Sequence, residues 1–300
     1  TYTSLTIHGL GSSDEGPAEI TLSRSQSFPP PRFFQDYAPV RRNEKWAPLP
    51  LPKNGAHLEL ELTRSIARGR VGLTYSARVV QNTASMDLPD LCVKFVMPCY
   101  SRTLAREAWF YEQLARKPGY EGVVTPRCFG FFTVPLKDCL DVKGQLVSHI
   151  KPWEVESNSD DTDETEEEED LDWWLPDDPP SLQRYFEDND GWKSGSPWNK
   201  WKPSPPSESL ICVLVLEELG ESYLRPNERE GDGKYANEEE ELNDIRDVVR
   251  DVSSTGIVHR DIRCCNVLRA TRNVRKFSFR SCERQGLKET RNRGVLASYY

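Results

Sequence analysis

Apolar residues along this chain come in short runs separated by turn-forming residues, and most runs have the length of one strand. Alternating or continuous apolar positions predict strands, and a Gly-containing turn joins the first two. The expected strands cover 57–63, 72–80, 91–97, 123–134 and 210–216. The last of these is apolar throughout, which favours a strand buried on both faces.

Helical spacing appears in two further places. Leu104, Ala108, Tyr111 and Leu114 recur at intervals of three or four, so we expect a helix over 103–114. A second helix is expected over 238–253, where Leu, Ile and Val recur at similar spacing before Gly256.

Two long segments lack any sustained period. Residues 1–53 are rich in Ser and Pro and are expected to form a disordered extension. Residues 150–209 contain an acidic run at 164–170 together with Pro and Trp residues, and they are expected to be a mostly disordered insertion. Clustered carboxylates repel one another and bury little area.

Composition refines this picture. The chain has 300 residues, 37% of them hydrophobic, a mean hydropathy of −0.67 and a formal net charge of −9. The segment 154–190 holds 17 acidic residues against Arg184 alone, whereas 267–300 holds nine basic residues against two acidic ones. The net charge is therefore an average over an acidic insertion and a basic tail, and it says little about partners.

Targeting signals and cysteine usage suggest a compartment. The longest apolar runs have strand length, and the first residues show no signal-peptide pattern. Eight cysteines occur without any CxxC pair, which argues against a zinc site or a disulfide framework. We therefore expect a cytoplasmic or nuclear protein that does not contact a membrane, with nucleic acid an unlikely partner.

Two candidate ligand-binding pieces lie in the expected strands. Gly69 and Gly72, three residues apart, would let a turn approach a polyphosphate with its N–H groups. Lys94 stands alone among apolar neighbours, and an ammonium there loses hydration unless it meets an anion. Taken singly, these features also fit an ordinary hairpin turn and a lysine that faces water.

Two more pieces carry acidic groups. Glu107 lies on the first expected helix and is a possible partner for Lys94, although Glu112 on the same helix competes with it. The segment His259-Arg260-Asp261-Ile262-Arg263-Cys264-Cys265-Asn266 places Asp and Asn five residues apart between a helix and an apolar pair. That spacing suits phosphoryl transfer, in which Asp261 accepts the hydroxyl proton and Asn266 binds Mg²⁺.

In this order, the four pieces resemble the motifs of the eukaryotic protein-kinase superfamily over about 57–148 and 209–268. The general character of the sequence and its acidic insertion also resemble those of kinase-like proteins in filamentous fungi. The resemblance implies an α+β, bilobal fold with a five-stranded antiparallel N-terminal lobe and one long helix. The second, helical lobe would be incomplete.

The resemblance also implies roles for single residues. Gly69 and Gly72 would belong to the glycine-rich loop, and Lys94 with Glu107 would hold the phosphates of ATP. The backbone of Glu217 and Leu219 would bind adenine.

In the catalytic loop that the resemblance implies, Asp261 would act as the base. Arg263 would contact the γ-phosphate or the substrate. Asn266 would be a ligand of Mg²⁺, so ATP and Mg²⁺ are the expected cofactors.

The sequence departs from the kinase pattern in three places. Ala67 stands where the first loop glycine is usual, and Arg263 stands where serine/threonine kinases usually carry Lys. No Asp follows Asn266, so the Asp-Phe-Gly motif is missing. Three interpretations of the basic tail 269–300 fit the sequence: a truncated or misspliced product, a divergent pseudokinase, and a nucleic-acid-binding tail.

The expected organisation has four parts: an extension at 1–53, an N-terminal lobe at 54–220 with its insertion at 150–209, a partial second lobe at 221–268, and a non-homologous tail at 269–300. The expected function is ATP-dependent phosphoryl transfer to a protein Ser, Thr or Tyr hydroxyl, impaired by the missing segments. Two alternatives are a nucleotide-binding scaffold without catalysis and a small-molecule phosphotransferase of the aminoglycoside or choline kinase type. Arg260 argues against the latter, because those enzymes usually carry Gly between His and Asp.

Overall fold

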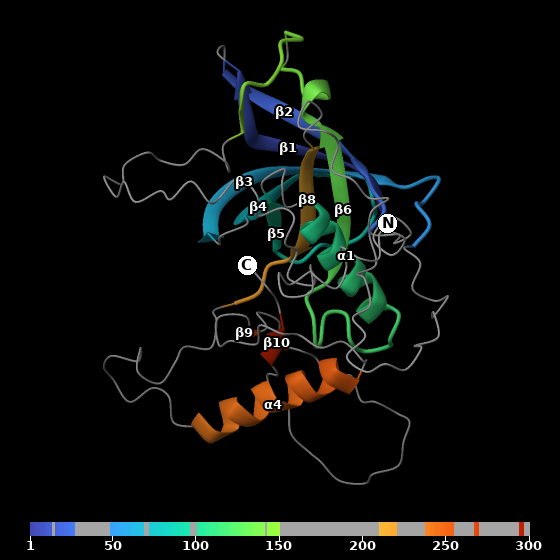
Figure 1. Cartoon of the computed structure of the whole chain (residues 1–300), viewed down its shortest axis with the longest axis vertical. Helices are drawn as coiled ribbons and strands as arrows, with labels where there is room; N and C mark the ends of the chain where they lie inside the picture. The colour runs from blue at the N-terminus through green and yellow to red at the C-terminus, as the bar shows by residue number, and fades with distance from the viewer. Residues whose placement is uncertain are drawn as a thin grey trace, which may run out of the picture.

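The computed structural model is dominated by β-structure (Figure 1). It describes residues 1–13, 16–27, 49–68, 72–96, 101–141, 143–150, 210–220, 238–254, 267–269 and 294–296. The strands are β1 (Tyr2–Ser13), β2 (Gly16–Arg24), β3 (Ala56–Arg68), β4 (Gly72–Asn82), β5 (Leu91–Val96), β6 (Cys128–Pro135), β7 (His149–Ile150), β8 (Leu210–Glu217), β9 (Val267–Arg269) and β10 (Gly294–Leu296). The helices within these ranges are α1 (Ser101–Ala115), α4 (Glu238–Ser254) and the 3-10 turn η3 (Leu136–Asp138).

Seven of the strands close into a barrel. Their order is β2-β6-β8-β5-β4-β3-β1, and β1 pairs again with β2. Every neighbouring pair is antiparallel except β1 with β3, which run parallel. The short strand β7 adds to β1 outside this ring. The sheet is therefore mixed and closed.

Closure of the barrel makes the kinase resemblance wrong. A bilobal fold needs an open N-terminal sheet and a helical second lobe, whereas this chain has a closed seven-stranded barrel and two α-helices within the described ranges. The five strands expected from the sequence are present as β3, β4, β5, β6 and β8. Two further strands join their ends, so the expected five-stranded antiparallel sheet is wrong as well.

The closing strands come from the segment that the sequence analysis assigned to a disordered extension. Residues Tyr2–Ser13 and Gly16–Arg24 form β1 and β2, so that expectation is wrong for these residues. In β2, Ala18, Ile20 and Leu22 are buried and alternate with exposed residues. This period of two is typical of a strand with one face in a core.

The barrel interior contains the largest of the three hydrophobic cores. Alternate residues point into it, among them Leu5 and Ile7 of β1, Leu58 and Leu60 of β3, Val93 and Phe95 of β5, and Val213 and Val215 of β8. Hence β5 and β8 bury both of their faces, one inside the barrel and one under α1. That double burial explains why both sequences are nearly continuous apolar runs.

A second core lies outside the barrel wall, and we call it the outer cluster. It contains Cys92, Val96, Cys212, Leu214 and Leu216 from β5 and β8, Phe131 from β6, Leu104, Ala105, Ala108 and Tyr111 from α1, Leu219 after β8, and Leu268 from β9. Figure 1 shows α1 beside β6 and β8. The outer cluster therefore attaches the helix to the barrel.

The other helix lies at the opposite end of the molecule from β1 and β2 (Figure 1). Val248 and Val252 of α4 pack with Val124 and Val267 in a third, smaller core. Neither described helix is long and apolar enough to cross a membrane.

Candidate functional site

The structure describes five of the residues that the sequence singled out for ligand binding or catalysis. They are Gly72, Lys94, Glu107, Glu217 and Leu219. The other four, Gly69, Asp261, Arg263 and Asn266, lie outside the described residues. The candidate site is therefore built from β4, β5, β8 and α1.

Lys94 lies in the centre of β5 with its side chain on the outer face of the barrel wall. Val93 and Phe95 on either side of it point into the barrel, so the alternation of the strand directs Lys94 toward α1. Its neighbours across the sheet are Thr74 on β4 and Leu214 on β8. Only 1% of the lysine is exposed.

Glu107 on α1 is the acidic partner of this lysine. Its Oε2 lies 2.7 Å from the ammonium Nζ of Lys94. The helix presents Leu104 and Ala108 to the outer cluster, and Glu107 lies three residues after Leu104, which makes the two neighbours on the helix surface. Apolar packing of α1 thus places the carboxylate over the strand.

The competing residue Glu112 has a different partner. Its carboxylate accepts a hydrogen bond from the hydroxyl of Ser27, which is fully buried, and a long one from the N–H of Leu49. Burial raises the pKa of the Glu112 carboxyl, and these hydrogen bonds oppose that effect. The structure thereby resolves a choice that the sequence left open.

Gly72 has a structural explanation in the described residues. A Cβ at this position would lie 2.0 Å from the carbonyl oxygen of Phe95, on the neighbouring strand β5. Close approach of two backbones therefore requires glycine here. This contact accounts for Gly72 without any ligand.

Glu217 is the last residue of β8, and Leu219 lies two residues beyond it. The N–H of Glu217 donates to the carbonyl of Arg127 at 2.9 Å, and its carboxylate accepts from the N–H of Arg127 at 3.2 Å. Leu219 is 6% exposed and belongs to the outer cluster. Both residues thus have packing roles, and the expected backbone contacts to adenine stay a prediction.

Strand β9, which follows Asn266 in the sequence, lies at this same face. Asn266 immediately precedes Val267, the first residue of β9. Leu268 of β9 belongs to the outer cluster, and the carbonyl of Arg269 accepts the N–H of Gly220 at 2.8 Å. Chain neighbours of the expected catalytic loop are therefore anchored next to β8.

Cysteine chemistry is disfavoured at this face. Cys212 lies on β8 within the outer cluster, and burial raises the pKa of its thiol to about 12. A thiol of that pKa is protonated near neutral pH and is a poor nucleophile. Lys94 and Glu107 are thus the ionisable pair that distinguishes this part of the barrel.

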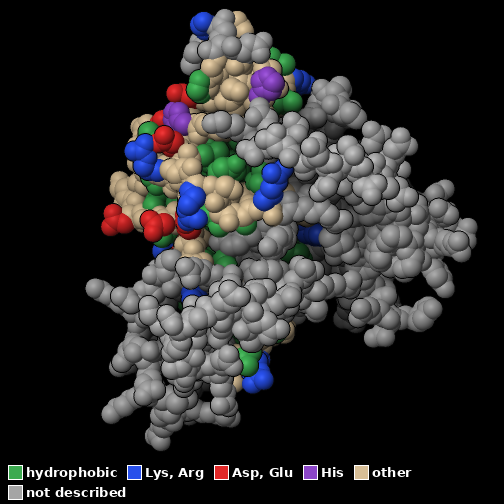
Figure 2. Space-filling view, turned by 90° about the vertical axis from the view of Figure 1, so that its left-hand side faces the viewer, with side chains coloured by type: hydrophobic (Ala, Val, Ile, Leu, Met, Phe, Trp, Pro, Cys, Tyr) green, Lys and Arg blue, Asp and Glu red, His purple; other side chains and the backbone are tan. Residues whose placement is uncertain are grey.

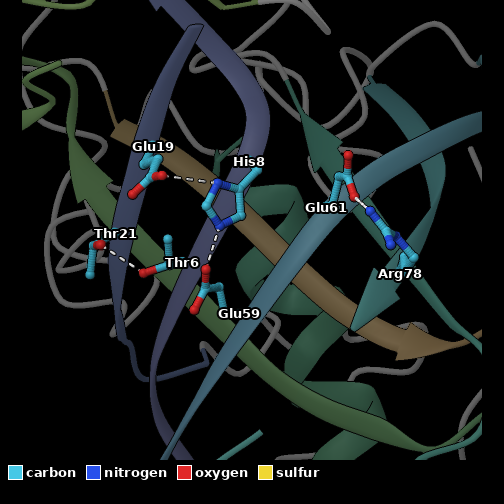
Figure 3. Close-up of polar contacts among 7 residues, drawn as sticks. All are labelled: Thr6, His8, Glu19, Thr21, Glu59, Glu61 and Arg78. Atoms are coloured by element: carbon cyan, nitrogen blue, oxygen red, sulfur yellow. Dashed lines mark hydrogen bonds and ion pairs between the residues drawn. The ribbon is translucent and has the colours of Figure 1, made fainter. Parts of the chain in front are cut away.

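Sequence reasoning missed polar residues in two places. Thr74 shares the outer face with Lys94, and strand alternation over 72–80 was the signal that could have identified it. The sequence analysis misses His8 because it expects a disordered extension over residues 1–53. Its imidazole lies between the carboxylates of Glu19 and Glu59 (Figure 3), with Nδ1 3.3 Å from Glu19 and Nε2 2.6 Å from Glu59.

The His8 group belongs to the surface of the barrel rather than to the candidate site. Figure 2 shows histidine, acidic and basic side chains together on the barrel face that it displays. Three strands contribute to the group, namely β1, β2 and β3 (Figure 3). It joins the closing strands to the rest of the wall.

No model of a known protein family matches the sequence, and no curated protein matches it either. Function must therefore be argued from the residues themselves.

Proposed function

We propose that the chain binds a nucleoside triphosphate, ATP supplied with Mg²⁺, and that Lys94 contacts its phosphate groups. The observation that carries the proposal is the ion pair of Lys94 and Glu107, whose nitrogen and oxygen lie 2.7 Å apart with the lysine 1% exposed. Removing an ammonium from water is costly, and a buried pair often stabilises a protein less than apolar residues would. Such a pair is better explained by a ligand that uses the charge.

Glu107 is the positioning residue in this proposal. The carboxylate holds the lysine ammonium at one place above the strand, while a phosphate oxygen adds a second anionic partner. Because both α1 and β5 are anchored in the outer cluster, the ammonium would not need to reorganise when the ligand arrives.

The reaction that we attach to this binding is transfer of the terminal phosphoryl group to a protein hydroxyl. Asp261 would take the hydroxyl proton, the substrate oxygen would bond to phosphorus, and the bond to the leaving nucleoside diphosphate would break. Support comes from β9, because Val267 directly follows Asn266 in the sequence and Leu268 packs in the outer cluster. Binding without transfer is the alternative.

Magnesium enters only as the ion that accompanies ATP. Within the described ranges no group of three or more His, Cys, Asp or Glu side chains gathers to hold a metal. Asn266, the expected ligand, lies outside those ranges. We therefore assign no step to the ion.

The proposal places the protein in the cytoplasm or nucleus, where ATP is abundant and thiols stay reduced. Among the described residues, Cys128, Cys139 and Cys212 are free thiols, which agrees with such a compartment.

The binding is tested by titrating the full chain with MgATP. Calorimetry and thermal unfolding are the two readouts. Ligand at 100 times its Kd stabilises the native state by about 2.7 kcal/mol, so the unfolding temperature should rise with MgATP. Lys94→Met should abolish the shift. Arg78→Met, which removes a cation paired with Glu61 on the barrel surface, is the matched control and should retain it. An unshifted wild type would overturn the proposal.

Transfer is tested separately with γ-labelled ATP and an acceptor mixture that contains proteins, sugars and amines. Label that depends on Asp261, and is lost in Asp261→Asn, supports the reaction. Binding without label supports the scaffold alternative. Label on a sugar or amine, with none on protein, supports a small-molecule phosphotransferase.

A further inference from the structure

Three buried polar atoms lie on the wall next to Lys94 without a hydrogen-bond partner. They are Oγ1 of Thr74, Oγ of Ser76 and Oε1 of Glu107. Thr74 and Ser76 are two residues apart on β4, so strand alternation places both on the outer face. Glu107 reaches the same face from α1, where its other oxygen meets Lys94.

Thr74 is the member of this set nearest in register to the lysine. It stands directly opposite Lys94 in the antiparallel pair of β4 and β5, whereas Ser76 stands opposite Cys92. Cross-strand neighbours of this kind have Cβ atoms about 5 Å apart. The Thr74 hydroxyl and the root of the Lys94 side chain are therefore adjacent.

An unpaired hydroxyl at this position needs an explanation. Thr74 is 0% exposed, so solvent does not replace the missing partner. Buried donors and acceptors in native proteins are nearly always paired, and an orphan calls for an explanation such as strain, a role in catalysis, an ion or a bound water. A valine would fill the same volume without the unpaired group.

We infer that Thr74 is a second ligand-contacting residue, whose hydroxyl donates a hydrogen bond to a phosphoryl oxygen of the nucleotide that Lys94 binds. This inference rests on the proposed function. It narrows the ligand to one that carries a phosphoryl oxygen beside the lysine, so a nucleoside di- or triphosphate fits and an unphosphorylated nucleoside does not.

The experiment measures the Kd of MgATP and of adenosine by calorimetry on the full chain. Thr74→Val should weaken MgATP about tenfold, the loss expected for one hydrogen bond to a charged acceptor. Thr74→Ser keeps the hydroxyl and should stay within about threefold of wild type. Ser76→Ala removes the other buried hydroxyl of β4 and should leave the Kd unchanged.

The ligand-free proteins provide an independent check. Because Oγ1 of Thr74 is buried without a hydrogen-bond partner, Thr74→Val should unfold at or above the wild-type temperature, while Thr74→Ser should not. If Thr74→Val fails to fold, Thr74→Ala removes the same hydroxyl and takes its place.

The outcomes separate this inference from the proposed function. If wild type does not bind MgATP, the proposed function fails. If wild type binds but Thr74→Val binds equally well, the proposed function stands and the Thr74 contact is wrong, which leaves the hydroxyl to a structural water. Equal weakening by Ser76→Ala would also overturn the inference, because the loss would then reflect a general disturbance of β4.

Discussion

Lys94 on β5 and Glu107 on α1 are joined at 2.7 Å, and the two elements also pack together in the outer cluster. The lysine is 1% exposed and the glutamate side chain 17%. The two side chains are thus unequally exposed: that of Lys94 is enclosed, while part of that of Glu107 reaches the surface, although its Oε1 is buried.

This asymmetry predicts the order of two substitutions. Glu107→Gln removes the carboxylate that pairs with the buried ammonium at 2.7 Å and should lower the free energy of unfolding by about 3 kcal/mol. Lys94→Met removes the buried charge itself and should lower it by less, about 1–2 kcal/mol, because Glu107 can turn toward solvent.

Urea unfolding at neutral pH measures both variants, with Glu61→Gln as control. Glu61 pairs with Arg78 on the surface, where 70% of the arginine side chain is exposed, and such pairs contribute about 0–1 kcal/mol. If Glu107→Gln costs no more than Glu61→Gln, the ammonium of Lys94 is solvated rather than enclosed.

Gly72 predicts a steric effect that needs no ligand. Gly72→Ala would put a methyl group 2.0 Å from the carbonyl oxygen of Phe95, so β4 and β5 would have to separate. We expect a loss of about 3 kcal/mol or more, measured as a lower urea midpoint. Gly144→Ala is the comparison, because its Cβ would meet nothing within 4 Å and only the positive φ of 78° opposes it. That variant should lose about 1 kcal/mol, and equal losses would contradict the close-approach argument.

The two acidic neighbours of His8 predict different losses of stability when each is replaced. Nε2 of His8 lies 2.6 Å from Glu59, whose side chain is 21% exposed, and Nδ1 lies 3.3 Å from Glu19, which is 59% exposed (Figure 3). A shorter and more buried contact contributes more. Glu59→Gln should therefore lower stability by about 0.5–1 kcal/mol and Glu19→Gln by close to nothing. Thermal unfolding at neutral pH compares them, and a larger loss for Glu19→Gln would show that β2 rather than β3 carries the interaction.

How far the sequence predicts this fold depends on how local each signal is. The runs over 72–80, 91–97 and 210–216 gave β4, β5 and β8, because alternation within a strand is a property of neighbouring residues. Closure of the barrel depends on β1 lying parallel to β3, with Leu5 beside Leu58. That pairing joins segments about fifty residues apart, and no local pattern encodes it.

The early strands also show how composition can conceal a period. Ala18, Ile20 and Leu22 alternate cleanly, yet the Ser- and Pro-rich stretch that follows them dominated the average over 1–53. At the candidate site, spacing alone could not decide between Glu107 and Glu112. The decision required Ser27, whose hydrogen bond to Glu112 exists only once the chain after β2 lies beside α1.

That contact of Glu112 leads to the last prediction, a stability that depends on pH. Burial raises the pKa of Glu112 above its ordinary value of 4.5, against the hydrogen bonds from Ser27 and Leu49 and the charges of Arg24 and Arg116. The folded protein therefore holds this proton more tightly than the unfolded chain does, so stability is full below about pH 4.5 and declines as pH rises through the folded pKa. Glutamine resembles the protonated acid, and its carbonyl can accept the same two hydrogen bonds. Glu112→Gln should accordingly raise the urea midpoint at pH 7, with a difference from wild type that disappears at pH 4. A lower midpoint at pH 7 would mean that attraction to Arg24 and Arg116 outweighs burial, and the direction of the pKa shift would then be wrong.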